Sequence, residues 1–370
     1  MLISPGKIGG IIFAVVLVGG LIYIGTKLAN DLSIVHSASV LPFILLGVAL
    51  LIALGFEFVN GFHDTANAIA TVIATRVLTP LQAILMAAAL NFVGAVTGTA
   101  VAKTVGAGPV DPKQANELAV VAALLAAITW NLITWYRGIP SSSSHALIGG
   151  IIGAAIAQAG LASPSWLAVI EKVILPLVLS PVAGFIFAGL IMIVLLRLFG
   201  TAHPRTMSSA FGRLQLVSSA YMAYSHGSND AQKTMGIITL ALFAHGVLPT
   251  FDVPVWVILI AATARACGTA VGGWRIIMTM GTKLAKLQPI DGFAAETAAA
   301  SVIEVASRLG FPLSTTHVIS SSILGVGTTR HPGGVHWQVA GDMITAWIIT
   351  IPICATLAYL YYLPLGLAAR

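Results

Sequence analysis

Long apolar runs separated by short polar stretches are the main pattern of the chain. A helix needs about 20 apolar residues to cross the hydrocarbon of a membrane. Such runs lie roughly at residues 8–28, 40–60, 81–105, 117–136, 166–198, 234–248, 254–274 and 337–363. They do not alternate apolar with polar residues, as the strands of a membrane barrel would. The pattern predicts an all-α, polytopic integral membrane protein, with about 10–12 membrane segments once short and broken helices are counted.

Two polar islands interrupt the apolar pattern, and they resemble each other. The first is Asn60-Gly61-Phe62-His63-Asp64-Thr65-Ala66-Asn67, and the second is Ser225-His226-Gly227-Ser228-Asn229-Asp230-Ala231-Gln232-Lys233. When Gly61 is superposed on Gly227, Asp64 falls on Asp230. The same superposition places His63 on Asn229 and Asn67 on Lys233. Two such islands predict one site that is built twice.

Further elements recur in the same order after each island. The sequence Gly98-Thr99-Ala100-Val101 returns as Gly268-Thr269-Ala270-Val271. The stretch Pro140-Ser141-Ser142-Ser143-Ser144-His145 is matched by Pro312-Leu313-Ser314-Thr315-Thr316-His317 at a near-equal distance from its aspartate. An ordered set of three repeated elements predicts an internal repeat, which is the architecture of many secondary transporters.

The repeat gives a division of the chain. We expect an extra N-terminal membrane helix and loop at 1–37, a first repeat at 38–198 and a second repeat at 214–370 that ends in a C-terminal helix. Between them, 199–213 is a basic linker that holds Arg205 and Arg213 and no acid. The positive-inside rule places such a linker in the cytoplasm.

The Pro-hydroxyl-His elements predict two re-entrant hairpins, near 137–158 and 308–328. Each follows an apolar helix and a Gly-Pro turn and precedes a short apolar helix. Proline and hydroxyl residues favour a helix start, and free N–H groups there attract anions. Hydroxyl groups add hydrogen-bond donors without a fixed charge, so an anion can leave again. The alternative is that these hydroxyls only cap their own helices or join neighbouring helices.

The paired carboxylates Asp64 and Asp230 are the other candidate chemistry. An ionised carboxylate costs several kcal/mol at the membrane centre, and such residues usually line an ion or substrate path. The alternative is a position near the interface, paired with a loop arginine. Five further charged residues fit a functional role and a structural one equally well, the structural role being an ion pair or a charge at the membrane interface. They are Glu57, Arg265, Arg275, Glu304 and Asp342.

The length of the segment from Leu41 to Arg76 imposes a geometric constraint. As one helix it would extend about 50 Å, whereas the hydrocarbon core is about 30 Å thick. It must therefore tilt or break, and Asn60-Gly61 is where a break would fall. Non-helical backbone at membrane depth is tolerated only where it is buried in protein or lines a water-filled cavity.

At the two islands and the two Pro-hydroxyl-His elements, the chain resembles the PiT inorganic phosphate transporter family, in its bacterial low-affinity branch. The resemblance covers nearly all of the chain after residue 40. It implies a multi-pass symporter of the bacterial inner membrane, built from two inverted repeats, that imports inorganic phosphate, alone or as a metal-phosphate complex. A homodimer is a further option. The implied phosphate-binding residues are Asp64, Asn67, Ser142, Ser143, Ser144, Asn229, Asp230, Ser314, Thr315 and Thr316.

The coupling ion is predicted from departures from the family pattern. Sodium-coupled members resemble one another in carrying Asn where this chain has His63 and Lys233. Sodium prefers oxygen ligands, whereas His63 offers a nitrogen and Lys233 offers no acceptor. We therefore expect protons to be the coupling ion, with His63, Asp64, Asp230 and Lys233 as the cation-coupling residues. Sodium is the alternative coupling ion. A separate alternative for Lys233 itself is that its side chain extends to the lipid interface.

Three other functions fit parts of the sequence. Sulfate or another oxyanion would find the same hydroxyls and helix ends. A channel is less consistent with paired broken helices, which suit alternating access. An intramembrane hydrolase could use Ser143 or Ser144 with His145 or His317, but a catalytic site needs one nucleophile and one base, whereas this element occurs twice. We therefore expect a transporter rather than an enzyme.

Overall fold

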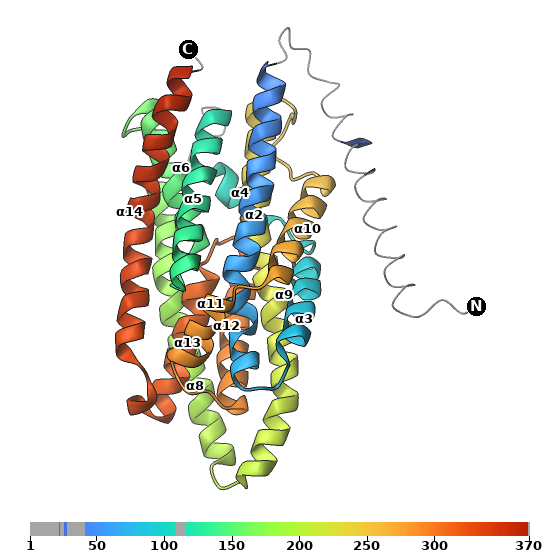
Figure 1. Cartoon of the computed structure of the whole chain (residues 1–370), viewed down its shortest axis with the longest axis vertical. Coiled ribbons are helices and arrows are strands. Elements are labelled where there is room, and N and C mark those ends of the chain that lie inside the picture. Colours follow the sequence, from blue (N-terminus) through green and yellow to red (C-terminus); the bar gives the residue numbers. More distant parts are fainter. Residues whose placement is uncertain (1–21, 23–25, 28–40, 109–115, 369–370) are drawn as a thin grey trace, which may run out of the picture.

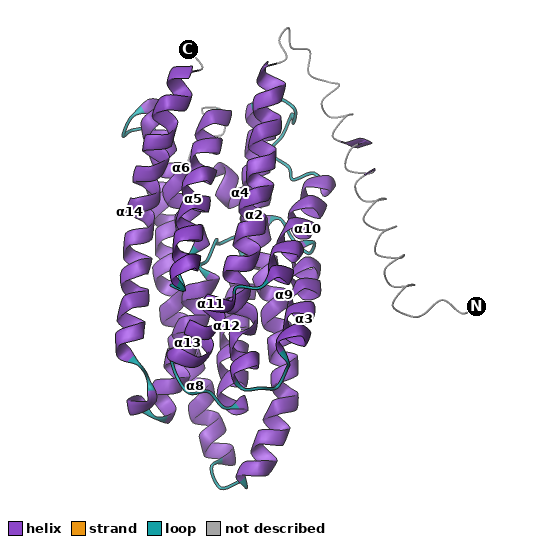
Figure 2. Ribbon diagram, in the orientation of Figure 1, coloured by secondary structure: helices purple, strands orange, loops and turns teal. Residues whose placement is uncertain are grey.

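A computed structural model describes residues 22, 26–27, 41–108 and 116–368 of the chain. In this part the protein is made of helices (Figure 2), and its only β pairing is the isolated bridge between Ala285 and Val335. The predicted all-α fold is therefore confirmed. The predicted helix at 8–28 and the predicted segment 1–37 lie outside the described residues, except for positions 22, 26 and 27.

The same order of helices occurs twice along the chain. The first set is α2 (Leu41–Ala74), α3 (Pro80–Ala95), α4 (Ala100–Ala107), α5 (Glu117–Arg137), α6 (Ser143–Ala159), α7 (Trp166–Val169), a π-helical turn (Ile170–Ile174) and α8 (Leu175–Phe199). The second set is α9 (Pro204–Ala244), α10 (Val255–Val271), α11 (Trp274–Met278), a π-helical turn (Thr279–Lys283), α12 (Pro289–Arg308), α13 (Thr315–Arg330), a 3-10 turn (Pro332–Gly334) and α14 (Trp337–Ala368).

The two sets run in opposite directions. In Figure 1, α2 descends from the upper end while α9 ascends from the lower end, and α8 and α14 show the same reversal. Each of these helices packs on a helix of the other repeat, and equivalent helices have equivalent partners. Helix α2 packs on α10 and α9 packs on α3, while α6 packs on α14 and α13 packs on α8. The fold therefore consists of two inverted repeats whose helices interlock.

Glycines in equivalent places bring these helix pairs close together. A Cβ added to Gly94 would lie 2.0 Å from the Tyr224 oxygen of α9, and one added to Gly268 would lie 2.2 Å from the Phe58 oxygen of α2. Gly94 in α3 is thus the structural equivalent of Gly268 in α10. Pairing Gly98-Thr99 with Gly268-Thr269 by sequence is wrong, because Gly98-Thr99 lies in the turn between α3 and α4, whereas Gly268-Thr269 lies inside α10.

The two island helices are continuous, so of the two alternatives for the length of α2, a tilt or a break at Asn60-Gly61, the break does not occur. Helix α2 has 34 residues and α9 has 41. The run at 234–248 is therefore not a separate span but mostly the end of α9. A break would free backbone groups at a depth without water. Gly61 instead lets the backbone of α10 approach, since an added Cβ would lie 2.6 Å from the Arg265 oxygen.

Broken helices do occur, one helix later in each repeat. Helices α3 and α4 meet at a bend of 74°, and α10 meets the α11 segment at a bend of 63°. The second break contains Gly272, whose φ of 75° favours a glycine. The runs predicted as single helices at 81–105 and 254–274 contain these bends.

Two helical hairpins follow, at the places predicted from the Pro-hydroxyl-His elements. Helix α5 ends at Gly138 (φ 67°) before α6, and α12 ends just before Gly310 (φ 79°) and α13. Ser142 and Ser314 are the N-caps of the two short helices. Both hairpin tips are buried inside the protein.

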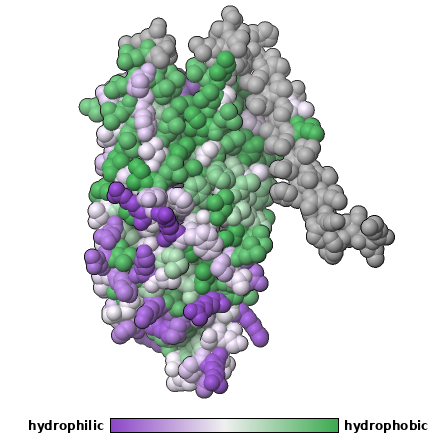
Figure 3. Space-filling view, viewed as in Figure 1, coloured by the Kyte–Doolittle hydropathy of each residue, from purple (hydrophilic) through white to green (hydrophobic). Residues whose placement is uncertain are grey.

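The surface agrees with a multi-pass membrane protein. Among the described residues, four helices are long and apolar enough to cross a membrane, or up to six if each bent pair is one span. Apolar side chains cover much of the visible face, and hydrophilic ones gather toward the lower end (Figure 3). The non-helical turn between α8 and α9 comprises residues 200–203, so Arg205 and Arg213 of the predicted linker lie in α9.

The close helix contacts give a first prediction. Gly94→Ala should destabilise the protein by about 1–3 kcal/mol, because its new methyl group would overlap the backbone of α9. Gly55→Ala is the matched control: this glycine also lies inside a helix, but nothing surrounds its added Cβ within 4 Å. Its change should be neutral or stabilising by about 0.5–1 kcal/mol, because alanine favours helix. Thermal unfolding in detergent measures both, and equal melting temperatures would contradict the packing described here.

Candidate functional site

A buried polar layer separates two apolar cores. Along α2, residues 46–56 belong to one core and 66–72 to the other, while along α9 the order is reversed. The polar islands occupy the stretches between, and both hairpin tips meet them there. Side chains in such a layer must find their partners inside the protein, because unpaired buried polar groups are costly.

Asp64 lies at the centre of the first half of the layer. Its Oδ1 is 2.6 Å from Nδ1 of His63, and its Oδ2 accepts a hydrogen bond of 2.7 Å from the Ser143 hydroxyl at the tip of α6. On the other edge of the ring, His63 Nε2 is 3.0 Å from the hydroxyl of Thr134. The carboxylate is therefore held between its own helix and the first hairpin.

Asp230 occupies the equivalent place in the second half but has a different charge environment. Lys233 Nζ lies 2.5 Å from its Oδ1, and Arg265 Nη2 lies 2.8 Å from its Oδ2. The Thr315 hydroxyl at the tip of α13 donates to Oδ2 at 3.0 Å, as Ser143 does to Asp64. Two cations thus form ion pairs with Asp230, whereas among the described residues the ion-pair partner of Asp64 is His63.

The residues one turn further along each island connect the two repeats. Asn67 donates to Thr316 Oγ1 at 2.9 Å and to Thr315 Oγ1 at 3.2 Å, so α2 of the first repeat contacts the second hairpin. Lys233 donates to Ser144 Oγ at 2.5 Å, so α9 of the second repeat contacts the first hairpin. Lys233 also donates to the carbonyl oxygen of Leu313 at 2.7 Å.

The two aspartates converge across the repeat boundary. One ligand atom each from Asp64, Asp230 and His226 lie within 4.8 Å of one another, and all three residues are buried. This is a donor set that could hold a cation. The ammonium of Lys233 and the guanidinium of Arg265 already contact the Asp230 carboxylate, so positive charge is present without a metal ion.

Three predicted site residues support the hairpins instead of facing the aspartates. The Ser142 and Ser314 hydroxyls accept hydrogen bonds from the backbone N–H groups of His145 and His317 and so cap their helices. Asn229 donates to Ser307 and accepts from the Leu313 N–H, which fixes the second tip. Their side chains position the binding elements. The other predicted residues lie together in the polar layer.

Three of the five charges that the sequence left ambiguous separate into two groups. Arg265 is buried, and its second nitrogen lies 3.6 Å from Glu57, which in turn accepts from Thr234. These residues belong to the site. Glu304 instead pairs with Arg308 on its own helix, at a largely exposed guanidinium. The signal for Arg265 was a lone arginine inside an otherwise apolar helix.

Glu296 is a buried acid that the sequence reading missed. It accepts hydrogen bonds from Thr71, Gln215 and Ser218, and no cation in the described part of the chain pairs with it. Thr71 lies two helical turns beyond Asp64. Two features of the sequence could have pointed to Glu296. It is a single carboxylate in an alanine-rich helix, and α2 carries hydroxyl residues at helical spacing.

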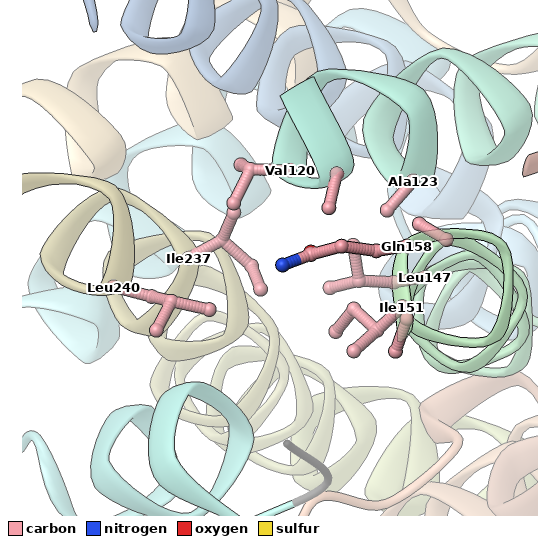
Figure 4. A pocket seen from close by; sticks show the side chains of 10 residues that line it. Val120, Ala123, Leu147, Ile151, Gln158, Ile237 and Leu240 are labelled. Carbon is pink, nitrogen blue, oxygen red and sulfur yellow. The ribbon is translucent and has the colours of Figure 1, made fainter. Parts of the chain in front are cut away.

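On the opposite side of the polar layer, the described residues form no counterpart to this cluster. Ile237 lies two turns beyond Asp230, as Thr71 does beyond Asp64, and it lines a mainly apolar pocket with Leu147 and Ile151, into which the side chain of Gln158 also points (Figure 4). The pocket volume is about 30 Å³. The two sides of the layer therefore differ in polarity although the backbone repeats.

Comparisons with known proteins agree with this architecture. Residues 60–358 match the phosphate transporter family. A probable low-affinity inorganic phosphate transporter of Bacillus subtilis is 48% identical over 318 residues, covering 85% of this chain and 95% of that protein. One of Rhizobium meliloti, with the same description, is 46% identical over 331 residues, covering 89% and 99%. A solved structure of a sodium-dependent phosphate transporter is similar with a TM-score of 0.81 and 25% identity, covering 88% of this chain and 99% of that one.

The buried ion network gives a second prediction. Arg265→Met leaves Asp230 and Glu57 buried with less positive charge, which should cost about 3–5 kcal/mol of stability. Lys103→Met is the control, because the Lys103–Asp252 pair is exposed and such pairs contribute about 0–1 kcal/mol. The amount of folded protein that survives heating in detergent compares them. Equal loss in the two variants would show that Arg265 does not hold the site together.

Proposed function

Because the chain belongs to the phosphate transporter family, we propose that it imports inorganic phosphate as a secondary active symporter with protons as the coupling ion. The observation that carries the proposal is the meeting of two equivalent aspartate helices and two hydroxyl-rich hairpin tips in one buried layer. Binding sites between inverted repeats suit alternating access. By the positive-inside rule, the lower end of Figure 1, with Arg205 and Arg213, is assigned to the cytoplasm of a bacterial cell.

Phosphate would bind at the hairpin tips. The hydroxyls of Ser143, Ser144, Thr315 and Thr316 lie there, and the first N–H groups of α6 and α13 add to them. Helix N-termini favour anions through these N–H groups and the helix dipole. The ammonium of Lys233 lies among the same groups and would balance part of the phosphate charge.

The contacts of Asp64 suggest how a proton is coupled to phosphate. As a carboxylate, Asp64 accepts a hydrogen bond from the Ser143 hydroxyl and would repel an anion. A proton on the His63–Asp64 pair removes this repulsion and frees Ser143 to donate to phosphate. Asp230 is already balanced by two cations. We therefore assign the transported proton to the His63–Asp64 pair rather than to Asp230.

Lys233 argues against sodium as the coupling ion. Its ammonium is surrounded by Asp230 Oδ1, Ser144 Oγ and the Leu313 carbonyl oxygen at 2.5–2.7 Å. Oxygen ligands of this kind are what a hard cation prefers, and here a tethered cation fills the place. A tethered cation cannot be released with phosphate, so the driving ion must be another one. Sodium coupling, sulfate as substrate and co-transport of a divalent metal are the alternatives that uptake measurements separate.

A hydrolase is not supported by the geometry. Ser144 Oγ donates to the Leu313 carbonyl oxygen and accepts from the ammonium of Lys233, which is ion-paired with Asp230 and so has no lone pair to take a proton, while Ser143 donates to Asp64. The His145 ring packs edge-on against the His317 ring, with centroids 4.4 Å apart, and among the described residues neither histidine is a hydrogen-bond partner of Ser144. The relatives are described as transporters, which agrees with a function that is not enzymatic.

The hydroxyl donors give a third prediction. Hydrogen bonds to charged groups contribute about 1.5–3 kcal/mol each, so Ser143→Ala with Ser144→Ala, or Thr315→Ala with Thr316→Ala, should raise the half-saturating phosphate concentration about tenfold or more. Thr328→Ala with Thr329→Ala is the control on the same helix, because these hydroxyls bond to carbonyls of α13. Uptake of labelled phosphate measures the effect, with sulfate as competitor. Unchanged half-saturation in both tip variants would assign the hydroxyls to structure alone, and strong competition by sulfate would favour a general oxyanion carrier.

The coupling ion gives a fourth prediction. In proteoliposomes, an inward proton gradient should drive phosphate accumulation, a protonophore should abolish it, and replacing sodium with potassium should have no effect. Asp64→Asn mimics the protonated side chain. It should lose gradient-driven accumulation while still exchanging phosphate for phosphate across the membrane. A strict requirement for sodium would refute proton coupling. If Asp64→Asn shows gradient-driven uptake at the rate of the unmodified protein, the coupled proton must be assigned to another residue.

A further inference from the structure

A crevice far from the polar layer lies where the two repeats join. It has a volume of about 510 Å³, within the range of about 300–1,000 Å³ that is usual for small-molecule sites. The end of α8 forms one wall, the start of α9 forms another, and the start of α12 with the end of α13 closes it. We call it the joint crevice.

The joint crevice is amphipathic. Its apolar wall is formed chiefly by α8, with Met192, Leu195 and Phe199. The opposite wall carries Arg205, near the start of α9, and Arg330, at the end of α13. A smaller cavity of about 250 Å³ shares Arg330 with it and adds Lys286. An apolar trough thus leads to a basic end.

The basic end has an excess of positive charge. Arg330 donates hydrogen bonds to Asp291 and Gln288, each at 2.5 Å. The positive charge of Arg330 is therefore balanced by the Asp291 carboxylate. Among the described residues, no acid pairs with Arg205, whose side chain is exposed. Lys286 likewise forms no ion pair with a described residue. The free charge therefore lies at the mouth of the trough, where an anionic group would be stabilised.

The apolar wall is continuous with the membrane-facing surface. Along the last turns of α8, Leu196, Leu198 and Phe199 are exposed. In a chain that crosses a membrane, such residues contact lipid. The trough consequently opens to the bilayer at the same end of the protein as the basic residues.

We propose that the joint crevice binds one anionic phospholipid of the cytoplasmic leaflet. Its acyl chain lies along α8, and its headgroup phosphate contacts Arg205 and Arg330. Basic pockets between membrane helices on the cytoplasmic side are suited to such headgroups. Since α8 belongs to the first repeat and α9, α12 and α13 to the second, the lipid bridges the repeats away from the phosphate site.

The test uses the full chain, purified and delipidated in detergent. Phosphatidylglycerol or phosphatidylcholine is titrated, and bound lipid is counted by native mass spectrometry alongside the melting temperature. The unmodified protein should retain one phosphatidylglycerol in preference to phosphatidylcholine. Arg205→Gln should weaken this binding about fivefold, as expected for one basic residue near an anionic headgroup. Arg213→Gln is the charge-matched control, two turns further along α9 and outside the crevice, and should bind as the unmodified protein does.

A second pair of variants tests the shape of the trough. Ser208→Phe reduces the crevice volume without changing charge and should also weaken binding, whereas Ser209→Phe, the next residue, is outside the lining and should not. Equal retention of the two lipids would overturn the proposal, as would equal binding by Arg205→Gln and Arg213→Gln. Displacement of the bound phosphatidylglycerol by inorganic phosphate, counted in the same spectra, would show a site for free anions, which also contradicts a lipid site.

Discussion

The structure depends on one constraint: the polar side chains of the buried layer must take their hydrogen-bond partners from inside the protein. The layer lies between two apolar cores, so its carboxylates, amides and hydroxyls cannot rely on water. Asp64 and Asp230 therefore bond to the hairpin tips, and Asn67 and Lys233 bond to the tip of the opposite repeat. The same contacts that satisfy buried groups also fix where the two repeats meet. A ligand that enters the layer must replace these bonds rather than simply add to them.

The repeated backbone carries an asymmetric set of charges. His63 corresponds to Asn229, Asn67 to Lys233, and Asn91 in α3 to Arg265 in α10 by the glycine contacts of the two helix pairs. Both built-in cations therefore contact the second aspartate. Under the proposed function, this leaves the first aspartate as the group whose charge can change during transport. The repeat supplies the geometry for alternating access, while the substitutions between the copies decide which ion moves.

Much of this arrangement could be predicted from sequence, because the informative features are local and repeated. The hairpins were predicted from Gly-Pro turns followed by hydroxyl residues, and these are signals of helix ends. The continuity of α2 was not predictable from Asn60-Gly61, since glycine marks both breaks and close helix contacts. Only the nearby Arg265 backbone shows that Gly61 serves the second purpose. Glu296 was missed for a similar reason, because its partners come from α2 and α9 and share no motif with it.

Neutral donors at the hairpin tips are well suited to a carrier that must release its cargo. In the structure, Ser143 and Thr315 donate to carboxylates, so their hydroxyls have partners when no anion is bound. Binding an anion then exchanges one set of hydrogen bonds for another, and the net gain is smaller than for a donor that would otherwise be unpaired. A hydroxyl can change its acceptor by rotation about a single bond. An arginine at these two positions would instead add a permanent charge to a dry layer, and an anion held by it would leave slowly.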